Sequence, residues 1–139
     1  MELFRLTKAD FDALVPLHIA YKEAIGEGRP TFSDLDALKK AIDHSEILFF
    51  GCRENGHLVG CCSISIVFST FCYAPSGVFE DFYILPACRH RGIAKSLVRY
   101  AYENSGVKSL TVGCADCNLP LYNALGFSIP IGNMLAYDA

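Results

Sequence analysis

Residues 86–97, PACRHRGIAKSL, combine basic side chains with an unhindered backbone at the start of an expected helix. Arg89 and Arg91 supply positive charge, while Gly92 and Ala94 leave the main chain open to a bulky group. Free N–H groups and the positive end of a helix dipole together make an anion site. The stretch therefore predicts a phosphate-binding loop, with a solvated, charged helix start as the alternative.

Two common phosphate-binding motifs are absent from the sequence. A P-loop requires G-x-x-x-x-G-K-[ST], and the chain contains no Gly-Lys pair. The dinucleotide-binding pattern G-x-G-x-x-G after a strand is also absent. The loop must therefore belong to another class of phosphate-binding protein.

The composition of the chain argues against some partners and indicates a cellular compartment. The net charge of −3 argues against general nucleic-acid binding. No stretch approaches the ~18 apolar residues of a membrane span, and the charged N-terminus is not a signal peptide. The seven cysteines, an odd number set mostly among apolar residues, are typical of reduced thiols. We therefore expect a cytoplasmic protein that binds neither membrane nor nucleic acid.

Cys114 and Cys117 form a C-x-x-C pair, the one spacing in the chain that resembles a metal site. Zinc normally takes four ligands, which requires a second pair. The pair also precedes a Pro-containing turn, whereas a redox C-x-x-C normally opens a helix. We therefore expect structural thiols and no metal.

The periodicity of the chain predicts one mixed-sheet α/β domain over residues 1–139. Asn55-Gly56 between two apolar runs is typical of a tight β-hairpin. Thr7 and Asp10 form a capping box before the first helix. The remaining expected elements are a strand at 3–6, a helix from about 11, a second helix from Ser33 or Asp34, a loop at 74–77, a strand at 77–86, a helix from 93 to about 105, a strand at 107–114, a helix at 119–125 and a final strand or hairpin at 128–139.

The stretch FYILPACRHRGIAKSL resembles the acetyl-CoA motif of the GNAT superfamily of N-acetyltransferases, whose core pattern is [RQ]-x-x-G-x-[GA]. PLYNALGF resembles the second signature of the family, and LFRLTKADFDALVPLH resembles its usual opening. The resemblance covers nearly the whole chain. It implies a single-domain GNAT-like fold, with a mixed, mostly antiparallel twisted sheet flanked by helices.

The resemblance also implies how acetyl-CoA would be held. The backbone of the 82–84 segment would pair with the pantetheine arm, and N–H groups of the 89–95 loop would hold the pyrophosphate. One departure from the family is Ala115, where many members carry an Asn; Asn118 is the nearest candidate to replace it. The implied coenzyme-binding residues are Phe82, Tyr83, Ile84, Arg89, His90, Arg91, Gly92, Ile93, Ala94, Lys95 and Asn118.

Acetyl transfer to an amine involves two proton transfers, and the sequence offers candidates for both. The resemblance places Tyr122 near the coenzyme sulfur, where a phenol can protonate the departing thiolate. Glu80 and Asp81 are candidate bases, although adjacent residues of an ideal strand point to opposite faces, unless a bulge intervenes. A water relay is the alternative base. The resemblance also implies an oxyanion donor in a backbone N–H around Ile84.

The leading hypothesis is an acetyl-CoA-dependent N-acetyltransferase that acts by direct attack of a primary amine in a ternary complex. The alternative is a non-catalytic CoA- or acyl-CoA-binding sensor or interaction module. The acceptor, a small-molecule or peptide amine, is expected near the first two helices, the loop around GEGRPTF at 26–32, and the 68–77 loop. The family resemblance makes a homodimer possible. The residues expected around the acceptor are Tyr21, Glu23, Glu27, Phe32, Asp34, Phe71 and Tyr73.

Overall fold

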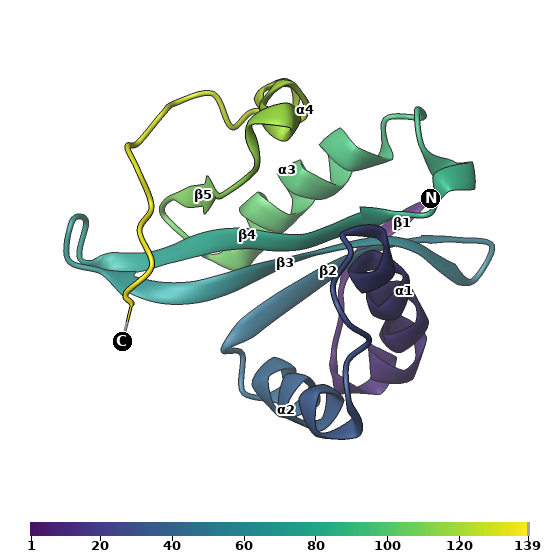
Figure 1. Ribbon diagram of the computed structural model, residues 1–139. Coiled ribbons are helices and arrows are strands. Elements are labelled where there is room, and N and C mark those ends of the chain that lie inside the picture. The colour runs from purple at the N-terminus through teal and green to yellow at the C-terminus, as the bar shows by residue number, and fades with distance from the viewer. Residues whose placement is uncertain (139) are drawn as a thin grey trace.

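Five strands form one sheet in the order β1-β2-β3-β4-β5, with helices on both faces (Figure 1). The first four strands pair antiparallel, and β5 pairs parallel to β4. The computed structural model describes residues 1–138. The strands are β1 (Glu2–Arg5), β2 (Ile47–Glu54), β3 (His57–Ser69), β4 (Ala74–Ile84) and β5 (Leu110–Val112). This mixed, mostly antiparallel α/β sheet confirms the expected fold class.

Four helices cover the sheet. They are α1 (Phe11–Ala24), α2 (Phe32–Asp43), α3 (Ile93–Ser105) and α4 (Leu119–Leu125), with short 3-10 turns at Lys8–Asp10, Pro86–Cys88 and Asp116–Asn118. α1 and α2 lie on one face of the sheet and α3 on the other (Figure 1). None of the helices within residues 1–138 combines the length and the apolar character needed to cross a membrane.

The predicted capping box of Thr7 and Asp10 is present. The Thr7 N–H donates to Asp10 Oδ2 at 2.8 Å, and the Ala9 N–H donates to Thr7 Oγ1 at 3.3 Å. Thr31 and Asp34 form a second box that the sequence analysis missed, so α2 begins at Phe32. Side-chain caps of this kind satisfy N–H groups that a helix start cannot bond internally.

Two apolar layers hold the helices against the sheet. The predicted stripe of α3 is buried, and Leu97 lies against Phe50 and Phe79 of the sheet. On the other face, Leu14 of α1 packs with Phe49 of β2. Both layers pass through β3 and β4, so these central strands are fixed from two sides.

Three predicted boundaries differ from the structure. β4 begins at Ala74, so residues 74–77 belong to a strand and not to a loop; Pro75 is tolerated because it lies near the strand's start. β5 spans only Leu110–Val112, within the predicted 107–114. Within 128–138 no strand or hairpin forms, so that prediction is wrong for these residues. Pro130 lacks an N–H, and Gly132 has φ +104°, so both interrupt a ladder; residue 139 lies outside the described residues.

Candidate active site

A β-bulge in β4 shapes the centre of the site. Ser63 pairs with Glu80 and Cys61 pairs with Tyr83, so β4 carries one more residue than β3 between these pairs. Asp81 lies in the bulge with φ +50°, a conformation that Asp tolerates better than most residues. The bulge breaks the alternation of the strand, and Glu80 and Asp81 consequently both line the same cavity.

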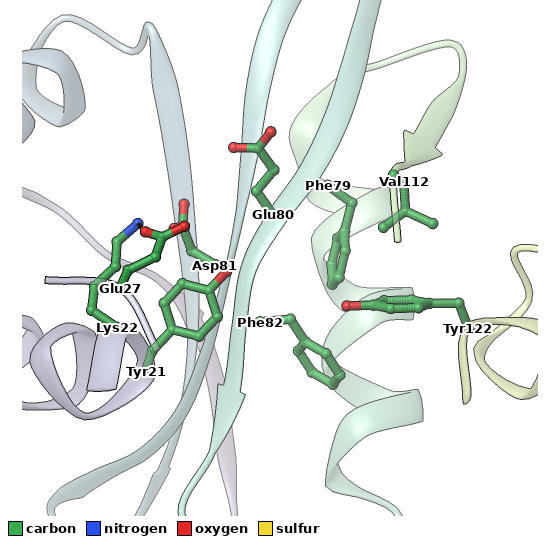
Figure 2. A pocket seen from close by; sticks show the side chains of 10 residues that line it. Tyr21, Lys22, Glu27, Phe79, Glu80, Asp81, Phe82, Val112 and Tyr122 are labelled. Atoms are coloured by element: carbon green, nitrogen blue, oxygen red, sulfur yellow. Dashed lines mark hydrogen bonds and ion pairs between the residues drawn. The ribbon is translucent and has the colours of Figure 1, made fainter. Parts of the chain in front are cut away.

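The cavity has a volume of about 300 Å³ and lies between α1, β4, β5 and α4 (Figure 2). The carboxylates come from β4 and from the segment after α1. Tyr122 reaches in from the opposite side, with its hydroxyl directed toward β4 (Figure 2). The lining residues are Tyr21, Lys22, Glu27, Phe79, Glu80, Asp81, Phe82, Val112, Gly113 and Tyr122.

β4 and β5 separate beside this cavity. Their parallel pairing covers only Gly77–Phe79 of β4. The predicted pantetheine-binding residues Phe82, Tyr83 and Ile84 lie beyond the last pair, so no described strand covers their side away from β3. An extended ligand can enter such an opening and bond to the exposed backbone like an added strand.

The predicted phosphate loop leads into an uncapped helix. Gly92, the N-cap of α3, has φ +80° and no capping side chain, and a Cβ built on it meets no atom within 4 Å. The N–H groups of Ile93, Ala94 and Lys95 form the first turn of α3, where no intrahelical acceptor exists. This geometry fits a bound phosphate.

The basic residues of the loop differ in their surroundings. The Arg89 N–H, expected at the pyrophosphate, donates to the Pro86 carbonyl oxygen at 3.3 Å. Arg89 Nε donates to the Ile84 carbonyl oxygen at 2.8 Å, so Arg89 braces the end of β4. Arg91 pairs with Glu54 of β2, with 2.8 Å between Arg91 Nη2 and Glu54 Oε2. His90, predicted to bind the coenzyme, is exposed and has φ +62°.

Tyr122 is fixed by the turn that ends α4. The Phe127 N–H donates to the Tyr122 carbonyl oxygen at 3.0 Å, and the two rings meet edge to face at 6.0 Å. Burial raises the pKa of Tyr122, with a smaller contribution from Cys114, so its hydroxyl keeps its proton at neutral pH. Asn118 is exposed at the start of α4 and does not line the cavity, so its contact with the coenzyme arm stays a prediction.

Asp81 is held from β3 and surrounded by groups of α1. Ser63 Oγ donates to Asp81 Oδ2 at 2.6 Å. Burial, and then the negative charge of Asp81, raise the pKa of Tyr21 to about 12. Lys22 Nζ lies 2.7 Å from Glu27 Oε2, so these two charges offset each other. The carboxylates of Glu80 and Asp81 therefore give the cavity its excess negative charge.

The residues expected around the acceptor do not all lie together. Tyr21 and Glu27 line the cavity, whereas Phe32, Phe71 and Tyr73 are exposed elsewhere, with relative exposures of 87%, 101% and 76%. Sequence reasoning missed Ser63, Glu54 and four lining residues, Lys22, Phe79, Val112 and Gly113. Val112 and Gly113 could have been suspected, because they end the strand next to the predicted coenzyme strand. Ser63 and Glu54 carry no sequence signal.

Comparisons with known proteins agree with this geometry. The sequence matches the acetyltransferase (GNAT) family over residues 11–127, and no curated protein matches it. A probable acetyltransferase has a similar structure, with TM-score 0.88, 20% identity, and 100% of this chain and 99% of that chain covered. At such identity, the likeness shows the fold.

Two further structures share the fold. One is an aminoglycoside acetyltransferase from an uncultured soil metagenomic sample in complex with sisomicin, with TM-score 0.84, 14% identity and coverage of 99% and 95%. The other is a predicted acetyltransferase with acetyl-CoA from Clostridium acetobutylicum, with TM-score 0.75, 16% identity and coverage of 98% and 95%. Because the family match extends over residues 11–127, most of its length, this chain belongs to the GNAT acetyltransferase family.

Proposed function

We propose that this protein is an acetyl-CoA-dependent N-acetyltransferase that acetylates a primary amine by direct attack in a ternary complex. The observation that carries the proposal is the cavity beside the separated ends of β4 and β5. It brings the carboxylates of the β4 bulge and the hydroxyl of Tyr122 to opposite sides of one space (Figure 2). A base and an acid facing each other suit a reaction with two proton transfers.

The residues present fit acetyl-CoA, which supplies the acetyl group as a thioester. The open space at Gly92 and the first-turn N–H groups of α3 suit a pyrophosphate. The 82–84 segment, uncovered on its β5 side, suits an extended arm. Arg91, the second basic residue of the loop, is paired with Glu54. The acetyl-CoA complex of the Clostridium acetobutylicum relative supports this assignment.

The chain's own groups supply the proton transfers. An alkylammonium has a pKa near ~10 and must lose a proton before it attacks. Asp81 or Glu80 takes that proton, directly or through water, and Tyr122 donates its proton to the departing thiolate. A backbone N–H around Ile84 is the proposed donor to the oxyanion.

The charge of the cavity favours a cationic acceptor. Three carboxylates and one lysine line it, and the ring of Tyr21 adds an aromatic wall. An amine that is protonated in solution is attracted to such a site before it loses its proton. The sisomicin complex of a structural relative supports small polyamines among the acceptors, and a peptide amine is the other class to test.

The test begins with calorimetric titration of the purified protein with acetyl-CoA, and with ATP and NAD as controls. The acceptor panel is sisomicin, spermidine, lysine and an alanine-initiated hexapeptide, with release of the CoA thiol as the readout. Binding with turnover of one amine supports the proposal. If acetyl-CoA binds but no amine is acetylated, the mechanism is contradicted and the sensor is favoured. If Asp81→Asn and Tyr122→Phe both acetylate as fast as the wild type, the mechanism is also contradicted.

A further inference from the structure

Ser63 is a polar residue in the most buried part of β3. Its relative exposure is 0%, as are those of its neighbours Cys62 and Ile64. A hydroxyl in such surroundings costs free energy unless it forms a hydrogen bond. The Ser63 hydroxyl donates its hydrogen bond to the carboxylate of Asp81, so this buried polar group is directed at the bulge of β4.

The bond has the geometry of a strong interaction with an ionised carboxylate. The 2.6 Å between Ser63 Oγ and Asp81 Oδ2 lies in the range of charge-assisted O–H···O⁻ bonds, about 2.5–2.7 Å. A carboxylate has two oxygens, so this bond fixes Oδ2 and leaves Oδ1 for another partner. Asp81 lines the cavity, whereas Ser63 does not.

Cys61 contacts the backbone of Asp81. Its Sγ lies 3.7 Å from the Asp81 carbonyl oxygen, and it is fully buried. Cys61 and Ser63 are two residues apart on one strand, so both side chains leave the same face of β3. Together they contact the backbone and the side chain of Asp81. Glu80 has no such contact with β3 side chains in the described structure and is exposed.

We propose that Ser63 is a positioning residue that orients the carboxylate of Asp81 as the proton acceptor, which makes Asp81 and not Glu80 the base. The inference rests on the proposed N-acetyltransferase function. In the step concerned, an N–H bond of the ammonium breaks and an O–H bond forms on Asp81. The amine lone pair forms the C–N bond at the acetyl carbon, and the C–S bond breaks as Tyr122 protonates the departing thiolate. The second proton, which the nitrogen loses as it becomes an amide, restores the Tyr122 hydroxyl through solvent, and Asp81 releases its proton to solvent.

Several titratable groups face Asp81 and belong in the interpretation of any pH profile. His18, Tyr21 and Lys22 come from α1, and Glu27 follows that helix. Within the cavity and the strands the groups are Glu80, Tyr122, Cys61 and Cys62. Burial lowers the pKa of His18, which faces the same carboxylate, so a pH profile of one variant alone cannot identify Asp81, and a pair of variants is needed.

The experiment is a double-mutant cycle with Ser63→Ala and Asp81→Asn, using acetyl-CoA and the panel amine that the wild type acetylates fastest. Asn keeps the shape of Asp81 and tolerates its φ, but it cannot take the proton. Ser63→Ala is expected to lower kcat/KM by about ten- to a hundredfold, the size of a lost charge-assisted bond. In the Asp81→Asn background, the same change is expected to have no further effect.

Partial rescue adds a second readout, because a merely structural Ser63 would respond to the size of the side chain and not to hydrogen-bond donation. Ser63→Cys, which keeps the size but donates weakly, is expected to give an intermediate loss and guards against misfolding of the alanine variant. Ser76→Ala is the matched control, because it removes another buried hydroxyl, bonded to Ser109 Oγ at 2.9 Å outside the cavity.

The outcomes separate the inference from the function. The role of Ser63 is overturned if the wild type is active and Ser63→Ala loses no kcat/KM. It is also overturned if Ser63→Ala lowers kcat/KM equally in the wild-type and Asp81→Asn backgrounds. Either result leaves the enzyme assignment standing. Full activity of Asp81→Asn overturns the choice of base. A wild type that acetylates none of the panel amines refutes the proposed function and this inference with it.

Discussion

Replacing Gly92 by Ala tests the phosphate loop with the smallest possible change. Gly92 has φ +80°, where an L-residue is disfavoured by about 1–2 kcal/mol. The added Cβ meets no atom within 4 Å, so the backbone conformation is the source of the cost. For 139 residues, the unfolding entropy is about 0.3 kcal/mol/K, and the melting temperature should fall by about 3–7 °C.

The same methyl group should also weaken acetyl-CoA binding. It occupies the open space beside the first-turn N–H groups of α3, where the pyrophosphate is proposed to lie. Loss of one charge-assisted hydrogen bond, about 1.5–3 kcal/mol, corresponds to roughly ten- to a hundredfold weaker binding. The assays are thermal unfolding followed by circular dichroism, and calorimetric titration with acetyl-CoA.

Gly106→Ala is the matched control. Gly106 ends the same helix with φ +76° and ψ 7°, against φ +80° and ψ 3° at Gly92, and its Cβ position is also open. Both variants should therefore lose similar stability, and only Gly92→Ala should lose affinity. Equal affinities for acetyl-CoA in the two variants would refute the assignment of the pyrophosphate to the start of α3.

Three further perturbations test the site and its supports. Tyr122→Phe should lower kcat by about a hundredfold or more, the size of general acid catalysis, with the acetyl-CoA Kd unchanged in calorimetry; an unaltered kcat would exclude Tyr122 as the acid. Burial lowers the pKa of His18 below 6.5, so its neutral form stabilises the fold above that pH, and the contribution is lost as the pH falls through the folded pKa. The free energy of unfolding, measured with urea, should therefore fall between pH 7.5 and 5.5 by up to about 1.4 kcal/mol per pH unit. In His18→Leu this free energy should change less with pH, and an equal pH dependence in the two proteins would contradict the role of His18. Glu54→Gln should release Arg91 and tighten acetyl-CoA binding up to about fivefold, whereas Glu2→Gln, which breaks another surface pair, should leave the Kd unchanged.

The features that sequence predicted well depend on neighbouring residues. Asn55 and Gly56 have φ +50° and +78°, as a tight hairpin turn requires, and they join β2 to β3. The Thr7 capping box and the buried stripe of α3 are also short-range patterns. The start of α3 after Gly92 is predictable for the same reason, whereas phosphate binding at this place stays a prediction.

The features that sequence could not predict depend on long-range pairing. The bulge arises from the register between β3 and β4, and no residue near Asp81 signals it. The bond between Ser63 and Asp81 joins residues 18 apart, and that between Arg91 and Glu54 joins residues 37 apart. The alternating apolar residues after Phe127 suggested a strand, yet Ile129 and Ile131 are 83% and 76% exposed, without a partner strand among the described residues.

The conformation of Asp81 limits how this site can change during evolution. At φ +50°, Asn, Asp and Gly are accepted most readily, so a longer Glu at this position would strain the bulge. The proposed base therefore cannot be exchanged for Glu without strain in the bulge. Substitution by Asn, in contrast, preserves the turn and the bond to Ser63 while removing the proton acceptor. The single substitution Asp81→Asn would therefore separate the proposed catalysis from coenzyme binding, and a residue at this position other than Asp, Asn or Gly would require a rebuilt strand.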